Sequence, residues 1–203
     1  MITSRQLPPE FLRRIESLET FYLQETDPTL QSGFSGGAVR WRRERGPILG
    51  AIDTDGDILD VGCANGYLLE CLVAWGREKG LVLTPFGLDI GPRLIDLAKR
   101  RMPQFADHFW VGNGWDWLPP RRFRYVYGLY DCVPVGYLAE YAERLLQRAV
   151  APGGRLILGA YGSRSRLEEP FDIAGFLHAT GFVVAGTATG SSPPLTRFAW
   201  IDA

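Results

Sequence analysis

The part of the sequence that most constrains the fold runs from residue 57 to residue 73, where an apolar run meets a turn of small residues and then a helical pattern. Ile58, Leu59 and Val61 form a short apolar run, typical of a buried parallel strand. After the turn, leucine and valine recur at helical spacing, at positions 68, 69, 72 and 73. A strand, a tight turn and a helix N-terminus in this order let the backbone approach a nucleotide-like ligand closely.

The turn itself has the pattern D-x-G-x-A-x-G over residues 60–66. We expect Gly62 and Gly66 to omit side chains where a ligand would clash, with Ala64 as the next smallest choice. Asp60 ends the strand, so we expect its carboxylate to point into the crevice beyond the sheet. The pattern is shorter than the G-x-G-x-x-G of dinucleotide sites, and a carboxylate here repels a pyrophosphate but attracts an amino group. A strand–turn–helix corner without any ligand is the alternative interpretation.

On this segment the chain resembles the class I S-adenosylmethionine-dependent methyltransferases, with alanine in place of the usual middle glycine. Their cofactor carries an ammonium group and no phosphate, which suits the acid at the strand end. The resemblance implies that S-adenosylmethionine, and its product S-adenosylhomocysteine, are bound here by Asp60, Gly62, Cys63, Ala64 and Gly66. The side chain of Cys63 is small, and we expect it to serve packing.

A second apolar strand ends in an acid at Asp89. A carboxylate at this place can accept hydrogen bonds from both hydroxyls of a ribose. In the family that the chain resembles, the matching acid holds the ribose and the next residue, here Ile90, touches the adenine. The alternative is that Asp89 caps the helix expected over residues 92–102, since aspartate is a good helix cap.

Two further segments match the family in order along the chain. After a short strand, Asn113 stands where family members bind the adenine amino group, and the backbone N–H of Gly114 is placed to reach a ring nitrogen; an ordinary Asn-Gly turn is the alternative. The next strand runs into a loop that, in the resembling enzymes, passes beneath the transferable methyl group. The resemblance implies backbone contacts near the sulfonium from Gly128 and Leu129, and an acceptor-facing, catalytic position for Tyr130 and Asp131.

Residues 1–52 are expected to form a helical cap or lid, and residues 53–203 the cofactor-binding core. Apolar spacing predicts a helix over 10–23 and a short one over 38–45, joined by a mobile, turn-rich connection. Arg40 is a candidate partner for the methionine carboxylate, with Trp41 as a wall of the pocket. The alternative places Trp41 in the core and Arg40 in water.

The order of the predicted elements indicates an α/β fold. Five strand–helix alternations predict a doubly wound, mostly parallel seven-stranded sheet with helices on both faces, in a single structural domain. Residues 152–154 (Pro-Gly-Gly) are expected to turn the chain before the fifth strand. A helix over 171–180 and two β-rich stretches, 182–189 and 195–202, then predict a terminal hairpin with an antiparallel last strand.

Composition narrows the partners. A net charge of −1 gives no basic footprint for nucleic acid, and 46% hydrophobic with 22% charged residues is typical of a soluble domain. No segment has the length and apolarity of a membrane helix or the pattern of a signal peptide. Three cysteines without metal-ligand spacing predict neither a metal site nor a disulfide framework, so a cytoplasmic, reducing location is expected.

These observations predict an S-adenosylmethionine-dependent methyltransferase, of EC 2.1.1, that methylates an O, N or C atom of a small-molecule acceptor. A nicotinamide-dependent oxidoreductase is one alternative, which the short glycine turn and the acid at its start disfavour. A non-catalytic S-adenosylmethionine-binding protein is the other, because no general base is evident.

Overall fold

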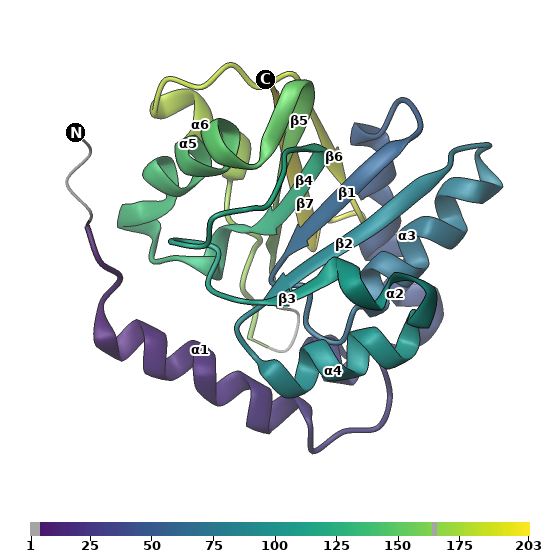
Figure 1. The fold of residues 1–203 in the computed structure, drawn as a ribbon. Helices are drawn as coiled ribbons and strands as arrows, with labels where there is room; N and C mark the ends of the chain where they lie inside the picture. The colour runs from purple at the N-terminus through teal and green to yellow at the C-terminus, as the bar shows by residue number, and fades with distance from the viewer. Residues whose placement is uncertain (1–4, 164–165) are drawn as a thin grey trace.

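The strands of the computed structural model, which describes residues 5–163 and 166–203, form one seven-stranded sheet (Figure 1). Their order across the sheet is β3-β2-β1-β4-β5-β7-β6. The first five are parallel, and β7 runs antiparallel between β5 and β6. This confirms the predicted fold class. The strands span Gly56–Val61 (β1), Leu83–Asp89 (β2), Phe109–Val111 (β3), Phe123–Leu129 (β4), Val150–Tyr161 (β5), Gly186–Thr189 (β6) and Thr196–Asp202 (β7).

Helices cover both faces of this sheet. Because successive side chains of a strand point to opposite faces, Leu59 and Val61 of β1 belong to one core cluster and Ile58 to the other. The first cluster packs under α1, α5 and α6, and the second under α2, α3 and α4. The helices are α1 (Pro9–Tyr22), α2 (Gly37–Arg45), α3 (Tyr67–Glu78), α4 (Pro92–Arg101), α5 (Leu138–Arg148) and α6 (Ile173–Ala179), with short 3₁₀ turns η1 (Leu30–Ser32), η2 (Gly46–Ala51), η3 (Pro103–His108), η4 (Tyr130–Cys132) and η5 (Val135–Tyr137).

The helix α1 lies along the edge where the parallel strands end (Figure 1). Its Phe11 side chain is buried in the core, and the backbone O of Arg5 just before it accepts a hydrogen bond from Trp115 Nε1 at 2.8 Å. Near the other end of the helix, Glu19 accepts from the backbone N of Arg93 at 2.7 Å and from its Nε at 3.1 Å. The first helix is therefore attached at both ends across one edge of the sheet.

The connection after α1, predicted to be mobile, is fastened to the turn that follows β1. Asn65 is fully buried and donates from Nδ2 to Pro28 O at 3.0 Å and to Gln31 Oε1 at 3.1 Å. Its Oδ1 accepts from Ser32 Oγ at 3.0 Å and from the backbone N of Tyr67 at 3.1 Å. One buried amide thus satisfies four partners, and the prediction of a loose connection is wrong for this part of it.

The Pro-Gly-Gly segment also differs from its prediction. Instead of turning the chain before the fifth strand, residues 152–154 lie inside β5. The register between β4 and β5 shifts there, since Phe123 pairs with Val150 and Tyr125 pairs with Arg155. The additional residues bulge from the strand, as expected where glycine relieves the backbone.

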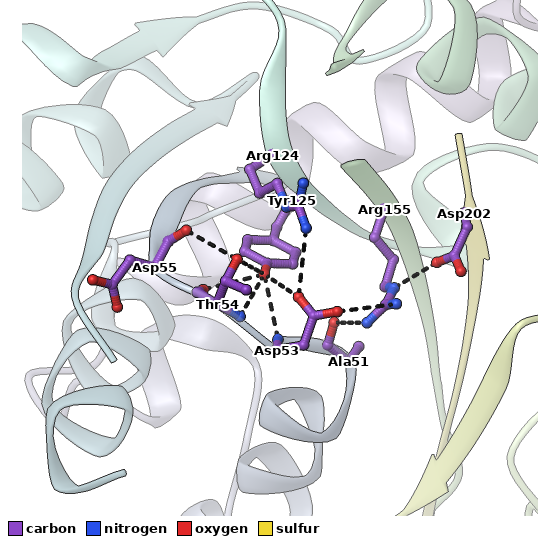
Figure 2. Close-up of polar contacts among 8 residues, drawn as sticks. All are labelled: Ala51, Asp53, Thr54, Asp55, Arg124, Tyr125, Arg155 and Asp202. Carbon is purple, nitrogen blue, oxygen red and sulfur yellow. Dashed lines mark hydrogen bonds and ion pairs between the residues drawn. The ribbon is translucent and has the colours of Figure 1, made fainter. Parts of the chain in front are cut away.

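At the opposite end of the parallel strands, Tyr125 holds the residues that precede β1 (Figure 2). Its ring is 1% exposed, and its hydroxyl donates to Asp53 Oδ1 at 2.7 Å while accepting from the backbone N of Thr54 at 3.0 Å. Arg155 donates to the backbone O of Ala51 at 2.6 Å and to Asp202 at 2.7 Å. These bonds tie the end of η2 to three strands, far from the edge that α1 covers.

Removing this hydroxyl is expected to lower the free energy of unfolding by about 2 kcal/mol, because Tyr125→Phe leaves buried partners unsatisfied. Urea unfolding at pH 7 measures the change. Tyr137→Phe is the control, because the contacts of Tyr137 with Arg5 and Trp115 are made by its ring. Equal stabilities of the two variants would contradict the role given to the Tyr125 hydroxyl.

Candidate functional site

The carboxyl ends of β1, β2 and β4 lie side by side beneath α1, at one end of the parallel strands. Val61 pairs with Leu88 on one side and with Gly128 on the other. In open parallel sheets this crevice, where the strand order reverses, is where ligands bind. Asp60 and Asp89, two of the predicted site residues, therefore come from neighbouring strand ends.

Asp60 is a buried carboxyl group at the end of β1. The residue is 2% exposed. Burial, and then the charge of Asp89, raise its pKa to about 8, and the charge of Arg45 opposes this. In the protein alone this acid is therefore mostly neutral at pH 7.

Arg45, the last residue of α2, is a buried cation that sequence reasoning missed. It is 5% exposed, and its guanidinium carbon lies 3.4 Å from the ring centroid of Tyr161 and 4.8 Å from that of Phe34. Its NH1 atom is buried and has no hydrogen-bond partner among the described residues. The only sequence signal was its place at the end of an arginine-rich helix, next to apolar residues.

Two tyrosines belong to the same group of polar residues as Asp60 and Arg45. Tyr127 of β4 pairs with Asp60 of β1 across the sheet, and its hydroxyl is hydrogen-bonded to that of Tyr161. Burial raises the pKa of both tyrosines, so both stay neutral at physiological pH. Within this group of four residues Arg45 is the charged one in the protein alone, and Asp60 becomes charged when it loses its proton.

Asp89 holds the turn after β1 and keeps room for a further partner. Its Oδ2 accepts from the backbone N of Ala64 and its Oδ1 from that of Gly91, both at 2.8 Å. Burial raises its pKa, although these two bonds oppose the shift. The helix α4 has Gly91 at its N-cap, and the acceptor for its first turn is Glu19 of α1. Capping by Asp89, the alternative interpretation, is therefore wrong.

The small residues of the turn lie where backbone conformation and neighbouring side chains leave little space. Ala64 has a φ of +47° in the left-handed region, where a side chain costs about 1–2 kcal/mol. A Cβ on Gly66 would lie 2.9 Å from the Cβ of Ala98, and one on Gly62 would lie 3.2 Å from Cys132 Sγ. The side chains missing at the two glycines thus make room for the protein's own packing. That they also leave room for a ligand stays a prediction. Cys63 is buried, as expected for a packing residue.

The turn after β3 lies next to Asp89, because the backbone N of Gly112 donates to Asp89 O at 2.9 Å. Within it, Asn113 Oδ1 accepts from the backbone N of Trp115 at 3.0 Å, which is the ordinary turn geometry. Gly114 packs directly on Val61, and a Cβ on Gly128 would lie 3.2 Å from the hydroxyl of Tyr141. The two glycines let β4 and this turn approach β1 closely.

The end of α1 faces the predicted catalytic residues. Tyr130 and Asp131 form η4 directly after β4, and the ring of Tyr130 stacks on Phe171 at 4.9 Å between centroids. Asp131 is exposed as a whole residue, yet desolvation raises the pKa of its carboxyl group. Burial, and then the charges of Asp131 and Asp89, raise the pKa of Tyr22, near the end of α1.

Arg40 and Trp41 lie beside Arg45: the Phe34 ring centroid is 5.2 Å from the guanidinium carbon of Arg40, and the Trp41 centroid is 5.0 Å from that of Arg45. The Nε atom of Arg40 is buried and has no hydrogen-bond partner among the described residues. Arg40 donates to the backbone O of Ser35 at 3.0 Å. Trp41 is 2% exposed and donates to Cys71 Sγ at 3.3 Å, so the alternative that placed it in the core is confirmed. Leu129 and Ile90, which follow β4 and β2 at the strand ends, are half-buried.

Within the described residues, no helix is long and apolar enough to cross a membrane. The same residues contain no group of three or more histidine, cysteine or acidic side chains able to hold a metal ion.

Comparison with known proteins points to the same fold. No protein-family model matches the chain. The demethylmenaquinone methyltransferases of two Tropheryma whipplei strains are 28% identical over 138 residues, or 66% of this chain and 53% of theirs. The chain therefore spans about half the length of the curated relatives it matches.

Solved structures resemble it over more of its length. The DhpI complex with SAM and HEP has a TM-score of 0.63 at 19% identity, covering 98% of both chains. A SAM-dependent methyltransferase of Aquifex aeolicus has a TM-score of 0.57 at 14% identity, covering 97% of this chain and 99% of that one. The glycopeptide N-methyltransferase MtfA with S-adenosylhomocysteine has a TM-score of 0.61 at 12% identity, covering 84% and 92%. At these identities the likeness shows a shared fold.

Proposed function

We propose that this chain, which has the fold of class I S-adenosylmethionine-dependent methyltransferases, is itself such a methyltransferase, of EC 2.1.1. The observation that carries the proposal is the pair Asp60 and Arg45. Both are buried, Asp60 is an acid that becomes an anion on losing its proton, and Arg45 is a cation whose NH1 atom has no hydrogen-bond partner among the described residues. The amino-acid end of S-adenosylmethionine supplies the two missing partners, an ammonium for Asp60 and a carboxylate for Arg45. Arg45 thus takes the part first expected of Arg40.

The other proposed contacts with the cofactor come from residues at or just after the ends of the parallel strands. Asp89 has unused lone pairs on both oxygens and is proposed to accept from the ribose hydroxyls. Ile90, Asn113 and the backbone of Gly114 are proposed to contact the adenine, supported by the hydrogen bond from Gly112 N to Asp89 O that holds their turn beside Asp89. The backbone of Gly128 and Leu129 is proposed to lie near the sulfonium, supported by the pairing of Gly128 with Val61 next to Asp60. The turn around Cys63 and Ala64 gives the close backbone approach, with Gly62 and Gly66 shaping it.

The bound cofactor supplies a methyl group on a positively charged sulfur, which is already activated for transfer. The protein then has mainly to position the reactants, an effect that contributes about 7–11 kcal/mol in well-oriented reactions. Tyr130 and Asp131 are proposed to face the acceptor beneath Tyr22. The raised pKa of Asp131 suits the removal of a proton from an acceptor oxygen or nitrogen near neutral pH.

The acceptor is proposed to be a small molecule, with α1 and the 24–37 connection as the lid over it. The names of the glycopeptide N-methyltransferase MtfA and of the demethylmenaquinone methyltransferases support this. A reducing, cytoplasmic location is proposed from the free thiols of Cys63, Cys71 and Cys132. Neither nucleic acid nor a membrane is proposed as a partner.

Titration calorimetry with S-adenosylhomocysteine tests the cofactor site. We expect Arg45→Met to bind it about 10–100-fold more weakly, since one charge-assisted contact is worth about 1.5–3 kcal/mol. Arg40→Met is the matched control and should bind as the wild type does, because Arg40 is held by Ser35. The opposite ranking of the two variants would return the carboxylate to Arg40.

The same calorimetry, together with an assay of methyl transfer, distinguishes the two alternative functions from the proposed one. Heat with NADH alone would establish a nicotinamide site and overturn the proposal, as would no heat with either S-adenosylmethionine or S-adenosylhomocysteine. Transfer of a labelled methyl group to any small-molecule acceptor would exclude a purely binding protein.

A further inference from the structure

Three aromatic rings surround the guanidinium group of Arg45. Its carbon atom lies 3.4 Å from the ring centroid of Tyr161, 4.8 Å from that of Phe34 and 5.0 Å from that of Trp41. All three distances fall within the roughly 6 Å over which a cation is attracted to the face of an aromatic ring. At 3.4 Å the guanidinium is in direct contact with Tyr161, which is therefore the strongest of these three partners.

The ring of Tyr161 is itself fixed in place. Its hydroxyl is hydrogen-bonded to that of Tyr127, which is 1% exposed in the central strand β4. Phe198 of the neighbouring strand β7 packs against the ring edge to face, with 6.2 Å between the centroids. The Tyr161 ring cannot turn away from Arg45 without losing both contacts, so it presents the guanidinium with a surface of fixed orientation.

The groups around Arg45 hold it without using all of its hydrogen-bond donors. Glu44, the acid next to it in the chain, meets Arg43 at 3.3 Å and accepts a hydrogen bond from Thr196 at 3.2 Å. Burial raises the pKa of the Tyr161 hydroxyl, so this neighbour is uncharged at pH 7. The NH1 atom of Arg45 is buried and has no hydrogen-bond partner among the described residues. A carboxylate can therefore still be received there.

We propose that Tyr161 is a positioning residue for the carboxylate of S-adenosylmethionine, and that it acts through Arg45. The ring holds the guanidinium where NH1 meets the carboxylate, and it thereby makes the site prefer cofactors that carry this group over their decarboxylated forms. An arginine free to change rotamer would lose that freedom on binding, and the ring removes this cost beforehand. The inference rests on the proposed function, because it takes the cofactor assigned there to Asp60 and Arg45.

Titration calorimetry of the full chain compares S-adenosylhomocysteine with its decarboxylated analogue, which keeps the amino group proposed to meet Asp60. We expect the wild type to prefer S-adenosylhomocysteine by about 10–100-fold. Tyr161→Leu removes the ring and should bind S-adenosylhomocysteine about tenfold more weakly, but the analogue as the wild type does. Tyr161→Phe keeps the ring and should retain the wild-type preference. A general disturbance of the site would instead weaken the binding of both ligands alike.

Tyr137→Leu is the matched control, because the ring of Tyr137 lies 3.6 Å from the guanidinium carbon of a different arginine, Arg5. Its preference between the two ligands should equal that of the wild type. A full preference in Tyr161→Leu, or a lost preference in Tyr161→Phe, would overturn the role of the ring and leave the cofactor site standing. A wild type that binds the two ligands equally, or binds neither, would overturn the proposed part of Arg45 and this inference with it.

Discussion

Asp60→Asn should stabilise the free protein relative to the wild type, increasingly so as the pH rises from about 5 to about 8. The pKa of Asp60 is about 8 in the folded chain and about 3.9 in the unfolded chain. Between these values the folded state holds a proton that the unfolded state has lost, so the wild-type free energy of unfolding falls with rising pH. Asparagine does not titrate, so the variant lacks this pH-dependent contribution to the free energy of unfolding. The difference between the two proteins should therefore grow by about 1.4 kcal/mol per pH unit.

Urea unfolding of both proteins at four pH values measures the slope. Asp53→Asn is the control, because hydrogen bonding to Tyr125 lowers the pKa of Asp53, and its charge is then the same in both states above pH 5. Its difference from the wild type should be flat over the range. A flat difference for Asp60→Asn as well would mean that Asp60 is not protonated in the free protein.

The same variant should lose affinity for S-adenosylhomocysteine, because asparagine offers no charge to an ammonium group. In the wild type, binding should tighten as the pH rises from about 6 to about 8, as Asp60 gives up its proton to receive the ligand. Greater stability and weaker binding in a single substitution would identify Asp60 as an acid retained for function at a cost in stability.

Asn65→Ala should be among the most damaging single changes in the chain. It removes four hydrogen bonds made by a fully buried side chain and leaves their partners unsatisfied, so we expect a loss of about 3 kcal/mol. Cofactor binding should weaken with it, because the turn after β1 and the 28–32 segment lose their common anchor. Thermal unfolding and calorimetry measure the two effects.

Gln31→Ala provides a graded comparison, since it removes one of these four bonds. It should cost about 1 kcal/mol. If Asn65→Ala were no worse than Gln31→Ala, the buried amide would not be what holds the connection in place.

Local patterns were sufficient to predict the sheet. Apolar runs ending in Asp60 and Asp89 placed two neighbouring strand ends correctly, and the change of pattern after residue 159 predicted the antiparallel last strand. These features depend on periodicity over a few residues. The Pro-Gly-Gly segment was placed wrongly because a bulge inside a strand and a turn before one have the same residue preferences.

The site was harder to predict, because its contacts join residues far apart in the chain. Arg45 reaches Tyr161 and acts on the pKa of Asp60 only after α2 packs on the sheet, and nothing in the pattern of α2 distinguishes this arginine from Arg40. The packing of Gly66 on Ala98 likewise depends on how α3 and α4 are arranged. The proposed roles of Asp89, Asn113, Tyr130 and Asp131 stay predictions until a ligand is bound.

The hydrogen-bond acceptor at the start of α4 belongs to another helix, which has a consequence for how α1 can move. The first turn of that helix, two residues beyond the Asp89–Gly91 hydrogen bond, is completed by Glu19, which belongs to α1. If α1 moves outward to admit a ligand, the start of α4 loses this acceptor, and that helix start lies beside the proposed ribose site at Asp89. Outward movement of α1 and loosening of the proposed ribose site are then coupled, so a ligand that orders the site should also favour the closed position of α1.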